Sequence, residues 1–219
     1  RILRVAVYSR RCLAEIRAAT GIQYDQAERG ILHVYSDPKE FKAAVPKAAL
    51  MTQYGCTREV LDVEGCVARE PALAESRHRL VGGTYSPDDE SGDAYKFTAG
   101  LADICKAMGV RFRYRTRVRR LIASGNHLIG VVTDGGTLND DDYDLFVLAM
   151  GSDTPLLLRP LGVRLPVYPA KGYSVTLPTE GYGGAPRVAI IDDEHKIVYS
   201  RLGERLRVGG TMEIAGDDD

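Results

Sequence analysis

Residues 111–121 read Arg-Phe-Arg-Tyr-Arg-Thr-Arg-Val-Arg-Arg-Leu, and residues 144–152 read Asp-Leu-Phe-Val-Leu-Ala-Met-Gly-Ser. The second stretch contains a continuous apolar run, which is typical of a buried strand. It ends on small residues that leave the backbone bare at the carboxyl end of the strand. Cofactors bind at that end of the strands in open α/β sheets. The two stretches therefore predict an α/β fold with a cofactor beside residues 149–151.

The Gly-x-Gly-x-x-Gly turn that usually holds a dinucleotide pyrophosphate does not occur in the 219 residues. The apolar pattern of residues 4–19 predicts an amphipathic helix with no cap or turn before it, and the chain stops just after an expected strand. We therefore expect the chain to be an internal fragment whose opening βαβ unit lies outside it.

The composition is that of an ordinary globular protein, with 44% hydrophobic and 27% charged residues. The formal net charge is −1, so the chain as a whole does not attract nucleic acid or an anionic membrane. The longest apolar runs, such as 145–150, are far too short to cross a bilayer. Four cysteines without Cys-x-x-Cys spacing indicate reduced thiols of a cytosolic protein, with a disulfide pair as the alternative.

The hydrophobic periodicity predicts alternating helices and strands, followed by a β-rich last third. Asp37-Pro38 should open the second helix, and Gly109 should close the last one. Helices are expected at 4–19, 38–53, 60–69 and 94–108. Strands are expected at 30–36, 82–86, 110–114, 118–124, 127–133, 144–149, 165–168, 172–177, 187–191, 196–201 and 205–211.

Other chemical patterns are weak. The four histidines lack the spacing of metal ligands, and His195 is better interpreted as a turn residue. The acids at 88–90 do not form an ordered calcium loop and are better interpreted as solvated loop residues, with Asp93 as a helix cap. The arginines of 111–120 alternate with apolar residues, which favours a half-buried strand; RNA binding is the weaker alternative.

Four patches of the sequence resemble one known family. They are Thr-Gly-Ile-Gln-Tyr-Asp at 20–25 with the strand at 30–35, Asp-Glu-Ser-Gly-Asp at 89–93, Pro-Val-Tyr-Pro-Ala-Lys-Gly-Tyr-Ser at 166–174, and the segment 196–213. In their order they resemble the FAD-dependent oxidoreductases of the D-amino-acid oxidase superfamily, and most closely the small chain of the bacterial D-amino-acid dehydrogenases. The family's dinucleotide fingerprint and its C-terminal flavin-contacting segment are absent.

The resemblance implies a mixed α/β fold. Part of it would be the remnant of an FAD-binding Rossmann-like domain, and the rest a mixed, mostly antiparallel substrate-domain sheet. It implies that residues 1–19 form a helix linked to the FAD domain, that 20–93 and 156–219 form the two parts of the substrate domain, and that 94–155 belong to the FAD domain.

The resemblance also implies cofactor-binding residues. Val118 would lend its backbone to the adenine of FAD, although a β-branched core residue is the alternative. Ala149 and Gly151 would let the chain turn beside the cofactor, because glycine brings no Cβ. Lys171 and Gly172 would lie near the flavin, where a lysine offsets negative charge on the reduced ring; the alternative is a solvent-facing lysine before an edge strand.

For the substrate, the resemblance points to Tyr173 and Tyr199, since tyrosine offers an apolar wall and one hydroxyl. It implies FAD-dependent oxidative deamination of D-amino acids to 2-oxo acids and ammonia. No acid–base residue is assigned, because the carboxylate-binding arginine of related oxidases commonly lies in the missing C-terminal segment. The alternatives are a non-catalytic small-molecule-binding module and a related enzyme acting on glycine- or sarcosine-type amines or on 2-hydroxy acids.

The expected partners are the amino-acid substrate and an electron acceptor such as a quinone, with no nucleic acid, metal or transmembrane segment. We expect a cytoplasmic protein, with a peripheral position on the inner face of the bacterial membrane as the alternative. The fragment itself should bind FAD poorly, because it lacks the glycine-rich turn that holds the pyrophosphate.

Overall fold

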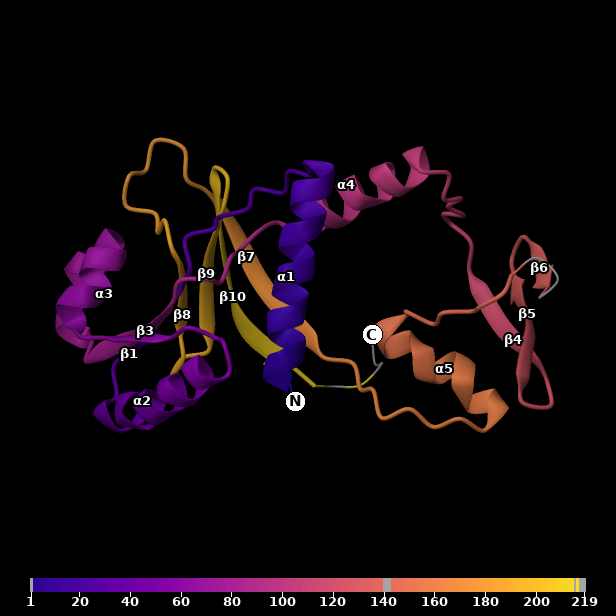
Figure 1. Cartoon of the computed structure of the whole chain (residues 1–219), viewed down its shortest axis with the longest axis horizontal. Coiled ribbons are helices and arrows are strands. Elements are labelled where there is room, and N and C mark those ends of the chain that lie inside the picture. Colours follow the sequence, from indigo (N-terminus) through magenta and orange to yellow (C-terminus); the bar gives the residue numbers. More distant parts are fainter. Residues whose placement is uncertain (1, 140–142, 215, 217–219) are drawn as a thin grey trace. The chain divides into compact units, whose positions relative to one another are not determined.

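The computed structural model describes residues 2–139, 143–214 and 216. The chain divides into two compact units, one of residues 1–109 with 172–212 and one of residues 110–171 with 213–219. Figure 1 labels their helices and strands. A mixed seven-stranded sheet and a separate three-stranded antiparallel sheet confirm the expected mixed α/β fold class.

The first unit is built on the seven-stranded sheet, whose strand order is β2-β3-β1-β8-β9-β10-β7. β1 pairs in parallel with β8, whereas the β1–β3, β8–β9 and β9–β10 pairings are antiparallel. Strands from both ends of the sequence therefore share one sheet. Its strands are β1 (Ile31–Tyr35), β2 (Glu59–Leu61), β3 (Gly82–Ser86), β7 (Lys171–Pro178), β8 (Ala189–Asp192), β9 (Ile197–Leu202) and β10 (Arg205–Glu213).

Helices α2 (Pro38–Gln53) and α3 (Val63–Arg69) cover opposite faces of β1 and β3. A Cβ added at Gly82 would meet the Phe41 ring of α2 at 2.4 Å, whereas one at Gly83 would meet a cysteine sulfur of α3 at 2.5 Å. Because successive strand residues point to opposite faces, β1 directs Leu32 toward α3 and His33 toward α2.

The core of the first unit lies on the α3 face of the sheet. Burial raises the pKa of the Cys66 thiol to about 11, so this cysteine packs as a small apolar side chain rather than as a nucleophile. Leu32 is also fully buried, and its truncation to alanine would cost about 2–5 kcal/mol. The buried members of the cluster are Leu32, Val34, Cys66, Tyr85, Val188 and Ile190.

Side-chain caps place two helices where the sequence predicted them. The Asp37 carboxylate accepts a hydrogen bond from the Lys39 amide at 2.7 Å and opens α2, which also carries proline in its first turn. Asp93 likewise caps α4 (Ala94–Ala107) by accepting from the Tyr95 amide at 2.9 Å. These caps confirm both predicted helix starts. The predicted N-terminal helix is α1 (Ile2–Thr20).

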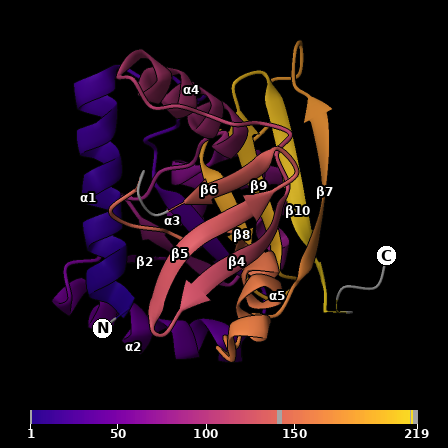
Figure 2. The same cartoon turned by 90° about the vertical axis from the view of Figure 1, so that its right-hand side faces the viewer.

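The second unit contains a meander of β4 (Val118–Ser124), β5 (His127–Thr133) and β6 (Gly136–Asn139), seen face-on in Figure 2. After the apolar run come the 3-10 helix η3 (Gly151–Asp153), α5 (Thr154–Leu158) and the 3-10 helix η4 (Arg159–Leu161). Helix α5 packs against β4. The predicted hairpin of β4 and β5 is confirmed.

Three predicted strands are wrong: residues 110–114, 144–149 and 165–168 do not form strands. The segment 144–149 has the composition of a strand buried between two neighbours, and no strand of the described residues pairs with it. Two of its large apolar side chains remain open to solvent, since Leu145 is 76% and Val147 78% exposed, while Phe146 and Leu148 are half-buried. An apolar run becomes a strand only where other strands satisfy its backbone N–H and C=O groups.

Two further boundaries differ from the prediction. The expected helix at 60–69 begins as the short strand β2, and only its second half is helical, as α3. The chain passes from the first unit to the second between residues 109 and 110, and back between residues 171 and 172. The sequence had placed these boundaries after residues 93 and 155. Which unit belongs to an FAD domain and which to a substrate domain stays a prediction.

Candidate functional site

The turn after the apolar run lines a cavity of about 950 Å³ in the second unit. Arg117 reaches this cavity from the start of β4, Ser152 and Asp153 from η3, and Lys171 from the start of β7. We call it the η3 cavity. Residues next to Val118 and Gly151 therefore line one cavity together with Lys171.

Gly151 begins η3 in a left-handed backbone conformation, with φ +55°. Apart from its two neighbours in the chain, none of the described residues has an atom within 4 Å of the position that a Cβ would occupy. Any residue other than glycine would be strained at this φ, typically by about 1–2 kcal/mol. The Ala149–Gly151 turn thus presents bare backbone beside open space, as expected of a chain that turns around a bound group.

Val118 lines a separate pocket of about 480 Å³ in the same unit, which we call the β4 pocket. Val118 is half-buried and pairs across the sheet with Thr133. The strand carries a register shift directly after it, between Val118 and Arg120, and such bulges are common beside binding sites. The other apolar walls are Val131, Leu138, Leu145, Phe146 and Val147, with Tyr143, Arg111 and Arg113 also present.

The remaining predicted residues lie on the seven-stranded sheet. At Gly172, the described residues other than its chain neighbours place no atom within 4 Å of the position that a Cβ would occupy. Tyr173 on β7 is 53% exposed. Tyr199 on β9 instead packs against the apolar core of the first unit. Of the two tyrosines, Tyr173 thus has the more accessible ring for a ligand.

An ion cluster that the sequence did not predict ties three distant segments together. Arg205 on β10 donates to Asp93 Oδ2 at 2.6 Å and to Asp25 Oδ2 at 3.2 Å. Lys96 Nζ lies 2.6 Å from Asp25 Oδ2. The hydrogen bond from Arg205 holds the pKa of Asp93 below its usual value, and the bond from Lys96 does the same for Asp25. No sequence signal connects Arg205 with residues 112 or 180 positions away.

The expectation that the acids at 88–90 are solvated is wrong for Glu90. Its carboxylate pairs with Arg17 of α1 at 2.7 Å and accepts a hydrogen bond from the Tyr24 hydroxyl at 3.1 Å. The Glu90 side chain is only 14% exposed. This loop therefore anchors α1 through two of its arginines, because Arg10 also pairs with Asp88 and Asp89.

His195 lies in the turn between β8 and β9 and contacts Asp192 at 2.9 Å, which agrees with its interpretation as a turn residue. In the part of the chain that the structure describes, no group of three or more His, Cys, Asp or Glu side chains is arranged to hold a metal ion. Within the same part, no helix is both long and apolar enough to cross a membrane.

The described residues fit the nucleoside end of FAD. The β4 pocket offers apolar walls for a flat ring, and the positive-φ glycine at 151 leaves free the space that a Cβ would fill. Lys171 contributes a cation to the η3 cavity. For the pyrophosphate, however, the sequence contains no glycine-rich strand–turn–helix.

Comparisons with known proteins also indicate an FAD-dependent oxidoreductase. A family model described as DAO, FAD dependent oxidoreductase, matches residues 1–219. The D-amino acid dehydrogenase of Paramagnetospirillum magneticum is 55% identical over 218 residues, which are 100% of this chain and 51% of that protein. The D-amino acid dehydrogenase of Dechloromonas aromatica is 51% identical over 98% of this chain and 52% of its own length. The chain thus spans about half the length of the curated relatives it matches.

Solved structures with the same fold share little sequence with the chain. The L-proline dehydrogenase from P. horikoshii superposes with a TM-score of 0.86 at 19% identity, covering 99% of this chain and 57% of the other. The glycine oxidase from Geobacillus kaustophilus has a TM-score of 0.82 at 23% identity, covering 98% and 57%. At such identities the likeness extends to the fold alone.

Proposed function

Because the chain belongs to the DAO family of FAD-dependent oxidoreductases, we propose that it forms part of a D-amino acid dehydrogenase. Such an enzyme converts D-amino acids to 2-oxo acids and ammonia. The observation that carries this proposal is the 55% identity to a D-amino acid dehydrogenase across the whole chain. When bound, FAD supplies the acceptor for the hydride that leaves the substrate Cα. The resulting imine of the substrate takes up water and releases ammonia.

The residues of this chain would bind and orient rather than exchange protons. In the proposal, the backbone at Val118 would hold the adenine, and the turn of Ala149 and Gly151 would make room for the cofactor, because glycine has no Cβ. Lys171 and Gly172 lie where β7 begins, and the lysine offsets negative charge that accumulates when the flavin is reduced. The open surroundings of Gly151 and Gly172 support these assignments.

For the substrate, the exposed ring of Tyr173 is the stronger candidate for an apolar wall of the binding site. Tyr199 remains a weaker candidate because its ring packs against the core. Replacement of tyrosine by phenylalanine keeps the apolar ring and removes only the hydroxyl. It therefore tests whether the hydroxyl also binds the substrate. We expect Tyr173→Phe to raise KM for a D-amino acid more than Tyr199→Phe does.

The electron acceptor and the cellular location belong to the proposal as well. The proposal is a cytoplasmic enzyme that passes electrons to an acceptor such as a quinone, with a peripheral position on the inner face of the membrane as the alternative. Salt extraction of membranes tests this, because a peripheral protein is released by high salt while a protein anchored in the lipid is retained. A protein found only in the cytosolic fraction at low salt would contradict the peripheral position.

Two alternatives can be separated from the main proposal. A non-catalytic binding module of the same fold would purify without flavin absorbance. A related oxidoreductase would carry flavin but would prefer glycine, sarcosine or a 2-hydroxy acid as the electron donor. The fold neighbours include a glycine oxidase, which is why these donors belong in the comparison.

The decisive experiment measures reduction of an artificial electron acceptor by the purified flavin-containing protein. We expect D-alanine to be oxidised with formation of pyruvate and ammonia, and L-alanine to be inert. Sarcosine, glycine and D-lactate serve as the alternative donors. Flavin absorbance together with a clear preference for any of these three over D-alanine would disprove the proposed substrate class and leave the family assignment intact.

A further inference from the structure

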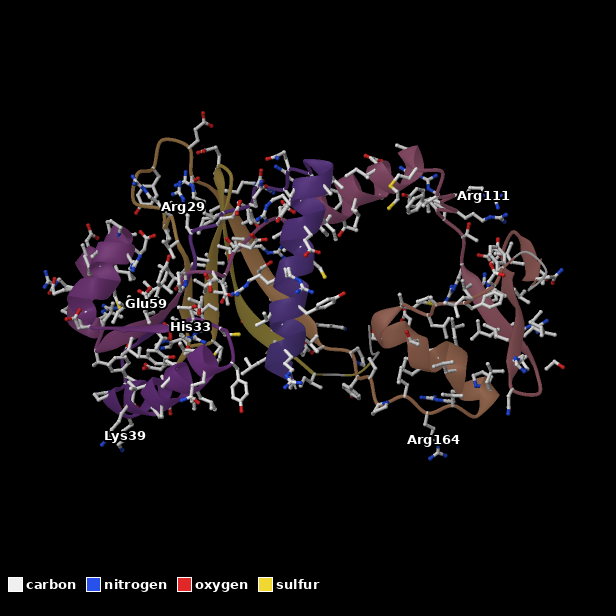
Figure 3. The ribbon with its side chains drawn as sticks, in the orientation of Figure 1. Arg29, His33, Lys39, Glu59, Arg111 and Arg164 are labelled. Carbon is white, nitrogen blue, oxygen red and sulfur yellow. The ribbon has the colours of Figure 1, made fainter. Side chains whose placement is uncertain are left out.

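A third cavity, distant in sequence from the predicted cofactor residues, opens between helix α2 and the seven-stranded sheet. Its volume is about 550 Å³, which is ample for a small metabolite. Two of the α2 side chains that face it, Ala44 and Ala48, are small and buried, so the helix leaves space above β1 and β3. His33 of β1 lies on this face, as Figure 3 shows. We call this cavity the α2 pocket.

Arg58 brings a cation without a carboxylate partner into the α2 pocket. Its Nε donates to Thr84 Oγ1 at 3.0 Å, and its Nη1 points to Met51 Sδ at 3.4 Å. A thioether sulfur is only a weak acceptor. Among the described residues, no carboxylate forms an ion pair with Arg58, although the residue is half-buried. A partly desolvated guanidinium held in one orientation favours an anion from outside the chain.

Two of the carboxylates that line the pocket already have other partners. Asp193 Oδ2 lies 2.7 Å from His33 Nδ1, and the Asp193 side chain is 32% exposed. Glu194 accepts hydrogen bonds from the backbone amides of Ser36 and Asp37. Neither acid is therefore free to turn toward Arg58.

The balance of charges in the pocket selects the kind of anion. Three cationic side chains, Arg58, Lys47 and Lys196, line it together with three acids, Glu40, Asp193 and Glu194. A doubly charged phosphate would bring one more negative charge than Arg58 neutralises, close to these three acids. A singly charged carboxylate pairs with the guanidinium in two parallel hydrogen bonds and brings no excess charge.

We propose that the α2 pocket binds a small carboxylate-bearing molecule, whose carboxylate pairs with Arg58. An amino acid and a 2-oxo acid share this chemistry, and both fit the volume. The site is distinct from the predicted cofactor residues, none of which lines it. The inference does not depend on the proposed flavin chemistry.

The ring protons of His33 report on the pocket directly. Burial lowers the pKa of His33, and the nearby Arg58 lowers it further, while Asp193 and the more distant Asp89 raise it. A carboxylate bound to Arg58 would neutralise the field of the guanidinium, so the pKa of His33 should rise. The other three histidines, His78, His127 and His195, do not line the pocket and serve as internal controls.

The test is a proton NMR titration of the histidine ring resonances of the full-length protein with D-alanine, pyruvate, D-alaninamide and inorganic phosphate. We expect saturable shifts of the His33 resonance with D-alanine, with pyruvate or with both, and the two arms show whether the natural ligand class is the amino acid or the 2-oxo acid. D-Alaninamide, which lacks the carboxylate, should leave His33 unchanged. Shifts with phosphate alone, or no saturable shift with either carboxylate, would overturn the proposal.

The variant Arg58→Gln should weaken binding by about tenfold or more, because a hydrogen bond to a charged group is lost. Arg29→Gln, which changes an exposed arginine outside the pocket (Figure 3), should bind as the wild type does. Unchanged affinity in a folded Arg58→Gln protein would also refute the assignment. The titration of the wild-type protein with D-alaninamide tests the role of the ligand carboxylate without any variant. The proposal therefore remains testable even if the Arg58→Gln protein does not fold.

Discussion

At the scale of single residues, the first unit depends on one buried charge. Glu70 is 1% exposed, yet its carboxylate is well satisfied. Oε1 accepts from the Ala72 amide at 3.0 Å, and Oε2 accepts from the amides of Arg187 and Val188, both at 2.7 Å. This glutamate joins segments more than a hundred positions apart, because an acceptor without hydrogens suits three backbone donors that converge.

Glu70→Ala should therefore destabilise the protein by about 3 kcal/mol or more, since three amides lose their acceptor inside the protein. Glu70→Gln should cost less than Glu70→Ala, because one carbonyl oxygen remains as an acceptor. It should still cost some stability, because the new NH2 group faces a backbone N–H donor. Urea unfolding measures both changes. Glu75→Ala, at an exposed position of the 3-10 helix η1 (Pro71–Arg79) that follows Glu70, is the matched control and should lie within about 0.5 kcal/mol of the wild type. A Glu70→Ala protein as stable as this control would show that the loop finds other acceptors.

The second residue-scale prediction concerns Gly151. Gly151→Val should reduce the FAD content of the full-length protein, because the space next to this glycine is empty of protein atoms and is assigned here to the cofactor. Gly162→Val is the matched control, since Gly162 also has a positive φ, of +76°, and open surroundings. Both variants place a β-branched residue at a positive φ, so the comparison separates backbone strain from a cofactor contact. Equal flavin-to-protein absorbance ratios in the two variants would argue against a cofactor contact at Gly151.

At the scale of elements, α4, the loop at Asp25 and β10 are joined by the cluster around Arg205. The pKa of Asp93 is lowered chiefly by the hydrogen bond from Arg205, and that of Asp25 chiefly by the bond from Lys96. A carboxyl group whose pKa is lower in the folded state stabilises the fold above its unfolded pKa of about 4. That stabilisation is lost as the pH falls from about 4 through the lower folded value.

Replacing Arg205 with glutamine should make the unfolding free energy less steeply dependent on pH below about 4, and should lower stability at neutral pH. Arg201→Gln is the control on the same hairpin, because Arg201 pairs with the exposed Glu204 at 3.4 Å and such surface pairs contribute little. Thermal unfolding at a series of acidic pH values provides the measurement. If the Arg205 and Arg201 variants follow the same pH curve, the cluster does not stabilise the fold.

At the scale of the whole molecule, half of the relatives' length is enough to form both sheets. Cofactor binding has a further requirement, because a pyrophosphate needs backbone N–H donors from a glycine-rich turn. We expect the 219-residue chain on its own to bind FAD weakly and to show no activity with D-amino acids. Titration of FAD into the purified chain, followed by flavin fluorescence, tests this expectation. Saturable micromolar binding would mean that the β4 pocket and the η3 cavity hold the cofactor without such a turn.

Local patterns in the sequence determined helices α1, α2 and α4, the caps of α2 and α4, the β-hairpins and the family resemblance. Asp37-Pro38 and Asp93 cap helices through atoms two positions away, so those contacts can be inferred from neighbours in the chain. The strand predicted at 144–149 failed for the opposite reason, because a strand's backbone groups need partners that the local pattern does not supply.

Only the tertiary structure decided which distant residues meet. The parallel pairing of β1 with β8 brings His33 to Asp193, and the antiparallel pairing with β3 places Thr84 beside His33 and so positions Arg58. No periodicity records these meetings, since strand order and register arise from the packing of the whole sheet. The sequence thus determined the family and many of the elements, while the α2 pocket exists only through contacts between residues that lie far apart along the chain.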